Sequence, residues 1–190
     1  MLCIDWRNAP GEMASSPQKK SVENEFLEYY NNLKASVANP TPQPTSPNDV
    51  PMTPLADNKQ DLLKQVMQID SNIQNYKRAG WSHYEHFGIA LAKLKRMYFT
   101  ACFHCKSKNP DMFEILSCLK CAKASNGNTF FKDLEQKIDY TPGYINYLIR
   151  IAALSAKYPK LKLTPWNFSL LSKYIAYLSD QMEKDKHLWV

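Results

Sequence analysis

Apolar residues recur with the 3.6-residue period of an α-helix along most of the chain, and no segment alternates apolar and polar residues with the period of two that strands require. Residues 58–78, for example, place Leu62 and Ile73 on one stripe, and the helical pattern resumes after a break at Gly80. The sequence therefore predicts an all-α fold in which the helices pack as a bundle.

Threonine–proline pairs mark the starts of two further helices. Thr141-Pro142 and Thr164-Pro165 each combine a residue that caps a helix N-terminus with a proline. Proline fits the first helical position because the amide hydrogen there has no partner within the helix. The helices that follow are expected to span residues 142–157 and 165–184.

The first part of the chain differs in composition from the rest. Residues 39–54 contain six prolines in sixteen positions, which is incompatible with a helix or a central strand and typical of an extended linker. We therefore expect residues 1–57 to be a largely disordered arm with one amphipathic helix at residues 21–38. The arm precedes a helical domain at residues 58–190.

The amphipathic helix at residues 21–38 has no core of its own to cover. It either docks back on the domain or lies in a groove on a protein partner. The apolar face of this helix offers Phe26, Tyr30 and Leu33 as partner-binding residues. We expect a protein partner at this helix, with docking on the domain as the alternative.

Charge divides the chain near the same boundary. Residues 1–60 carry five basic and seven acidic side chains, whereas residues 61–190 carry 19 basic and 11 acidic side chains, a net charge of +8. A basic domain on a slightly acidic arm favours a polyanionic partner such as nucleic acid. A well-solvated basic surface without such a partner is the alternative.

Four of the five cysteines form two Cys-x-x-Cys pairs with twelve residues between them. The spacing is typical of tetrahedral zinc, since each close pair can occupy one edge of the tetrahedron. One structural Zn²⁺ is therefore predicted, with the ligands Cys102, Cys105, Cys118 and Cys121. Reduced cysteines buried in a core, or a redox pair, are the alternatives, because the second pair lies in a segment with helical character.

A short helix, a tight turn and a longer helix follow the cysteine quartet. Residues 129–138 and 142–157 are the two helices, and Asp139-Tyr140-Thr141 is the turn. This arrangement is the plan of a helix-turn-helix, in which the second helix enters the major groove of DNA. An ordinary helical hairpin, whose polar residues face water, is the alternative.

The exposed face of the second helix supplies most of the predicted DNA contacts. Asparagine can form two hydrogen bonds with adenine and arginine two with guanine, and tyrosine can donate to phosphates. Lysines near the second cysteine pair add positive charge. The predicted DNA-binding residues are Thr141, Gly143, Tyr144, Asn146, Tyr147, Arg150, Lys120 and Lys123.

Three runs of residues around the quartet also share the pattern of a known family. They are Ile89-Ala-Leu-Ala-Lys-Leu-Lys, Gly127-Asn-Thr-Phe-Phe-Lys-Asp-Leu and Tyr140-Thr-Pro-Gly-Tyr-Ile-Asn-Tyr-Leu-Ile-Arg-Ile-Ala. With these runs, residues 89–157 resemble the helix-turn-helix domains of phage and plasmid ParB- and KorB-like proteins. Residues 100–126, which hold the quartet, stand as an insertion in that pattern. The resemblance implies binding to double-stranded DNA.

Several function classes are disfavoured by what the sequence lacks. It contains no Gly-rich phosphate loop, nucleophile elbow or His-Glu-x-x-His motif, so we expect neither an enzyme nor a small-molecule substrate. No apolar run approaches the ~20 residues that cross a bilayer, and the first residues lack the features of a secretion signal. We therefore expect a nuclear or otherwise intracellular protein that is neither secreted nor membrane-bound.

The predicted function combines these expectations. The chain is expected to be a non-enzymatic DNA-binding protein with a structural zinc ion. It would serve as an accessory or regulatory subunit of a larger nucleic-acid-processing or transcription complex. A protein-interaction or scaffold subunit without direct DNA contact is the alternative.

Overall fold

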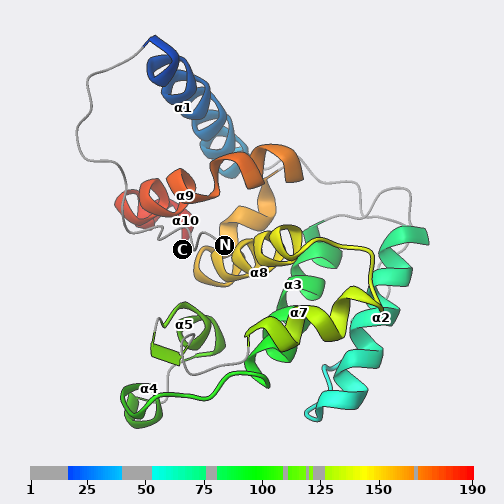
Figure 1. The fold of residues 1–190 in the computed structure, drawn as a ribbon. Coiled ribbons are helices and arrows are strands. Elements are labelled where there is room, and N and C mark those ends of the chain that lie inside the picture. Colours follow the sequence, from blue (N-terminus) through cyan, green and yellow to red (C-terminus); the bar gives the residue numbers. More distant parts are fainter. Residues whose placement is uncertain are drawn as a thin grey trace.

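The computed structural model describes residues 17–39, 53–75, 81–108, 111–118, 120–121, 127–164 and 167–190, and it has no strand in these ranges (Figure 1). The all-α prediction is confirmed. Residues 1–16 and 40–52, which hold much of the predicted arm and linker, lie outside the described residues. The helices are α1 (Pro17–Ala38), α2 (Lys59–Asn75), α3 (Trp81–Arg96), α4 (Phe103–Lys108), α5 (Met112–Ser117), α7 (Gly127–Glu135), α8 (Pro142–Lys157), the 3-10 helix η1 (Pro159–Leu163), α9 (Phe168–Lys184) and α10 (Lys186–Trp189).

The centre of the fold is an antiparallel pair made by α3 and α8. Ser155 Oγ donates to Glu85 near one end of the pair (3.0 Å), and Lys95 Nζ donates to Asn146 near the other (2.8 Å). Gly88 lies between them, at a point where the helices approach closely. A Cβ atom added there would lie 2.8 Å from the Ala152 Cβ and nearer still to a backbone carbonyl oxygen of α8. The absence of a side chain at this position allows the close contact.

Two hydrophobic cores meet at the helix pair, one toward each end of α8. The first joins α2, α3, α7 and the beginning of α8, and its fully buried members include Leu62, Phe87, Leu91, Phe130 and Leu148. The second joins the end of α8 with α1, η1, α9 and α10, and its members include Tyr30, Leu154, Tyr158, Tyr174 and Trp189. Because α8 contributes to both cores, it fixes their relative position.

Buried polar groups connect the start of α3 to the segment after α8. The Trp81 indole N–H donates to the Thr164 carbonyl oxygen (2.6 Å), and the buried carboxylate of Glu85 accepts from Lys162 (2.8 Å) as well as from Ser155. These contacts satisfy groups that would be costly to bury without a partner. Helix α9 begins at Phe168, later than the expected residue 165. Thr164 Oγ1 donates to the Leu161 carbonyl oxygen (2.6 Å), and Asn167 caps the helix instead.

The N-terminal helix α1 docks on the rest of the chain, which was one of the two expectations from the sequence (Figure 1). Phe26, Tyr30 and Leu33, the expected partner-binding residues, are buried against α9 and α10. The Tyr30 hydroxyl accepts from the Trp189 indole N–H (2.9 Å) and donates to Asp185 (2.9 Å). These three side chains can reach a partner only if α1 leaves the core. The expected domain boundary at residue 57 separates α1 from the helices that it packs on.

We expect Gly88→Ala to lower the free energy of unfolding by about 1–3 kcal/mol, because the new methyl group would overlap the backbone of α8. The loss must exceed the gain of about 1 kcal/mol that alanine normally brings to a helix interior. Gly143→Ala is the matched control, since its nearest neighbour, Thr141 Oγ1, is 3.8 Å away. Denaturant unfolding measures both variants. Equal stability of Gly88→Ala and the native protein would contradict the close approach.

Tyr30→Phe should destabilise the protein by about 1–3 kcal/mol, because the buried Trp189 N–H loses its hydrogen-bond acceptor and the half-buried Asp185 carboxylate loses one donor. The control is Tyr177→Phe, at a tyrosine that is 49% exposed. Thermal unfolding followed by circular dichroism compares the two. If both changes have the same small effect, the docking of α1 does not contribute to the stability of the fold.

Candidate metal centre and outer face of helix α8

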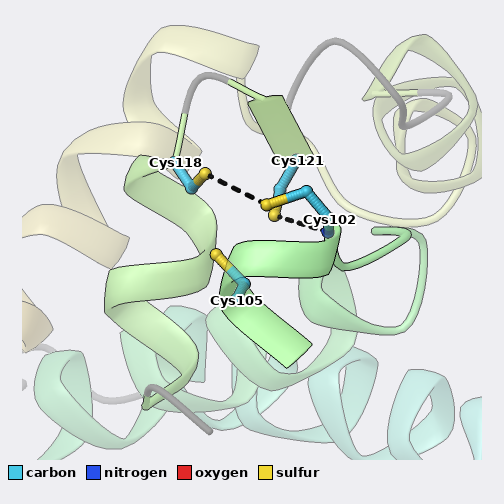
Figure 2. Close-up of side chains that lie close together, drawn as sticks. All are labelled: Cys102, Cys105, Cys118 and Cys121. Atoms are coloured by element: carbon cyan, nitrogen blue, oxygen red, sulfur yellow. Dashed lines mark hydrogen bonds between the residues drawn. The ribbon is translucent and has the colours of Figure 1, made fainter. Parts of the chain in front are cut away.

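The cysteine quartet follows the C-terminal end of α3 in the chain, and its members lie in or beside two short helices and, for Cys121, on the separate piece 120–121 (Figure 2). Cys102 immediately precedes α4, and Cys105 lies within it. The Asp111 side chain caps α5 by accepting from the Glu114 amide (2.8 Å), and Cys118 is the residue that ends this helix. Both helices are six residues long, so the chain turns back before it has moved far from the first pair.

The four sulfur atoms converge on one point (Figure 2). All lie within 4.8 Å of one another, and the Sγ atoms of Cys102 and Cys118 are 3.9 Å apart. Four thiolates around a tetrahedral ion with metal–sulfur bonds of about 2.3 Å are about 3.8 Å apart. None of the four is in a disulfide. The quartet can therefore hold a metal ion, and its four donors are all thiols.

Backbone amides favour the thiolate form of two of the cysteines. The amide of Cys121 lowers the pKa of Cys118 to about 6, and the amide of Cys105 lowers the pKa of Cys102. A hydrogen bond with the Cys121 side chain and burial raise the pKa of Cys105. In addition, the Cys102 amide donates to the Cys121 sulfur (3.2 Å). Amides directed at sulfur stabilise negative charge, and metal ligation by cysteine needs that charge.

The inner side of the quartet packs on the body of the protein. Cys105 and Cys121 are buried together with Phe99 and Ile115, and Leu116 contacts both this small cluster and the first core. The site is thus joined to α3 through α5. The sequence left two interpretations of the quartet open, cysteines buried in a core or ligands of a metal ion. In the structure the two are compatible, because the cysteines pack on the protein and their sulfurs also surround one centre.

The predicted DNA-binding residues of α8 divide into two groups. Gly143, Tyr147 and Arg150 are exposed, at spacings that place them along one side of the helix. Thr141 is also exposed, but its hydroxyl caps α8 by accepting from the Tyr144 amide (3.2 Å). Lys120 is exposed near the quartet, whereas Lys123 lies outside the described residues.

Tyr144 and Asn146 have partners within the protein. The Tyr144 ring stacks on Tyr140 with centroids 4.7 Å apart, and burial raises its pKa to about 12. Asn146 is half-buried, and its carbonyl oxygen accepts from Lys95. Burial lowers the pKa of Lys95 to about 8. The hydrogen bond between Lys95 and Asn146 was not predicted from the sequence, because the spacing of residues does not show that α3 packs beside this part of α8.

The connection between α7 and α8 is compact. Helix α7 ends at Glu135, but the Ile138 amide still donates to the Leu134 carbonyl oxygen (3.0 Å). The stretch between that last bond and α8 is residues 139–141, the turn expected from the sequence. The main packing partner of α8, however, is α3 rather than α7.

Comparisons with protein-family models, with curated proteins and with solved structures each gave no match. The resemblance of residues 89–157 to ParB- and KorB-like domains therefore stays a prediction. None of the helices in the described ranges has the length and apolar character needed to span a membrane.

We expect the protein to bind one equivalent of Co²⁺ and to develop the absorption bands of a tetrahedral thiolate complex, because all four sulfurs can reach one ion. Cys118→Ser should weaken or abolish these bands. Cys3→Ser is the control, since Cys3 is not part of the quartet. Unchanged spectra for Cys118→Ser, or no thiolate bands in the native protein, would contradict a shared metal site.

Proposed function

We propose that this protein is a non-enzymatic, double-stranded DNA-binding protein in which the quartet holds one structural Zn²⁺ and the outer face of α8 contacts DNA. On this proposal α7, the turn and α8 act as a helix-turn-helix. The protein would work inside the cell, in the nucleus where there is one, as an accessory or regulatory subunit of a nucleic-acid-processing or transcription complex.

The choice of zinc follows from the donor set. Four thiolates suit Zn²⁺, and a tetrahedron filled by four protein ligands has no open position for a substrate. The ion would therefore stabilise the segment and take no part in a reaction. A four-thiolate zinc centre carries two net negative charges. Residues 93–123 hold seven basic and two acidic side chains, which offset that charge. Zn²⁺ should displace Co²⁺ from the site.

One observation carries the DNA proposal: the exposed row of Gly143, Tyr147 and Arg150 on a helix whose other sides are buried in two cores. A helix held in this way presents its outer side chains in fixed positions. Among the described residues, no ion pair joins Arg150 to an acid. Partial burial lowers the pKa of Arg150, but a guanidinium remains charged at neutral pH. Its charge is therefore available to a phosphate or a guanine.

The surroundings of the row are also basic. Residues 61–190 carry a net charge of +8, so attraction to phosphates and the release of counterions would supply much of the affinity. Lys95 holds Asn146 in place and leaves the amide NH₂ group of that side chain as a donor. Since Tyr144 is stacked on Tyr140, we assign the main DNA contacts of α8 to Tyr147 and Arg150 of this row and to the neighbouring Asn146.

Arg150→Ala should weaken binding to duplex DNA by about 1–3 kcal/mol, roughly 5- to 150-fold, because one cation of the row is lost. Lys64→Ala is the matched control, since it removes one charge from α2 at a lysine that is already paired with Asp61 (3.2 Å). Arg150→Lys should recover binding to nonspecific DNA more fully than binding to a preferred site, because lysine keeps the charge and loses the two-bond contact. Fluorescence anisotropy with labelled duplexes at several salt concentrations measures all three.

Two results would contradict the DNA proposal. One is the absence of duplex binding at low salt by a protein that is folded by circular dichroism. The other is an Arg150→Ala variant that binds as tightly as the Lys64→Ala control. In either case a protein-interaction subunit without DNA contact takes the place of the proposal. Such a subunit would bind its partner through Phe26, Tyr30 and Leu33 only after α1 leaves the core, and through other surfaces while α1 is docked.

A further inference from the structure

Phe103, the first residue of α4, is 88% exposed. The other large apolar residues that are exposed in the described part of the chain range from 37% to 59%. Burial of a phenylalanine side chain stabilises a fold by about 1.5–3 kcal/mol, and a phenylalanine exposed to water does not contribute this free energy. Figure 1 shows α4 at the edge of the molecule, at the end of the connection from α3. The ring therefore projects from the protein at a peripheral site.

Two lysines share the surroundings of Phe103. Lys106 follows one ligand-type cysteine, Cys105, and Lys120 precedes another, Cys121, while Phe103 itself adjoins Cys102. Since the four sulfurs lie within 4.8 Å of one another, the three residues belong to chain segments that meet at the quartet. Lys106 is also three residues after Phe103 on α4, and residues at that spacing are neighbours on a helix surface. Both lysines are exposed, and no ion pair involves either among the described residues.

We propose that Phe103 is a stacking site for an unpaired base of single-stranded nucleic acid, and that Lys106 and Lys120 contact the phosphates beside that base. An exposed aromatic ring next to free cations is the combination that binds single strands without strong sequence preference. Each base offers a flat face to the ring, and each phosphate one negative charge to a lysine. The site goes beyond the proposed duplex contact, because it uses α4 and the quartet segment instead of α8.

The size of the apolar surface distinguishes this occupant from a protein partner. A stable protein–protein interface buries about 800 Å² on each side, whereas a single aromatic side chain provides about 150–250 Å². The other large apolar residues of α4 and α5 are Met112, Phe113, Ile115 and Leu116, and all four are buried or half-buried in the protein's own cores. Within these two helices the exposed apolar area is therefore that of one ring, which is far too small for a protein interface and matches the face of one base.

The test measures the affinity of the full-length protein for a labelled oligothymidine and, in parallel, an oligouridine of the same length, by fluorescence anisotropy at low salt. Phe103→Ala should weaken binding about 5- to 150-fold, the loss of one stacked base. Phe103→Trp should bind at least as well as the native protein, whereas Phe103→Leu should resemble Phe103→Ala because it is apolar without a flat face. A difference between the two oligonucleotides would show whether DNA or RNA is preferred.

Three controls separate this site from other effects. Leu163→Ala removes another exposed apolar side chain, 44% exposed on η1, and should leave single-strand binding unchanged. The Co²⁺ spectrum of each Phe103 variant shows whether the quartet is intact. Arg150→Ala should weaken duplex binding but not oligothymidine binding, so failure of the α8 proposal and failure of this one are distinguishable. The inference is overturned if the native protein binds no single strand, or if Phe103→Leu binds like Phe103→Trp.

Discussion

The close contact between α3 and α8 at Gly88 is the constraint on which the other parts of the structure depend. The backbones of the two helices can come into contact because residue 88 has no side chain. With that pair in place, α8 contributes to one core at each end, and α3 ends where the chain enters the quartet segment. Both proposed nucleic-acid surfaces are thus attached to the same rigid pair: the outer face of α8 directly, and Phe103 through the connection after α3.

The parts of the fold that the sequence predicted well are those with local physical causes. Thr141 and Pro142 begin α8 because a capping hydroxyl and a preset backbone angle act within one turn. The two Cys-x-x-Cys pairs are likewise recognisable from spacing alone. Docking of α1 is different, since it depends on Tyr30 meeting Trp189, 159 residues away. No periodicity in either helix specifies its partner, and so the sequence left docking and partner binding as alternatives.

The predicted DNA-binding residues of α8 show the same division between local and tertiary causes. Helical periodicity correctly placed Tyr147 and Arg150 on the outside, because the opposite side of α8 is apolar. It also placed Tyr144 there, but Tyr140 from the preceding turn stacks on that ring. The contact of Lys95 with Asn146 was equally hidden, because it crosses from α3 to α8. Periodicity gives the direction of a side chain from its own helix and says nothing about what neighbouring elements place over it.

The quartet connects metal binding to the shape of the surface. Four ionised thiols held within 4.8 Å would repel one another strongly, and a divalent cation at their centre replaces that repulsion with attraction. Phe103, Lys106 and Lys120 each adjoin one of the four ligands, so fixing the ligands holds the backbone at these three positions together. A structural ion here would have a role beyond stability. It would keep the backbone that carries the proposed stacking ring and its two lysines in one arrangement, and it would do so on a segment too short to have a large core of its own.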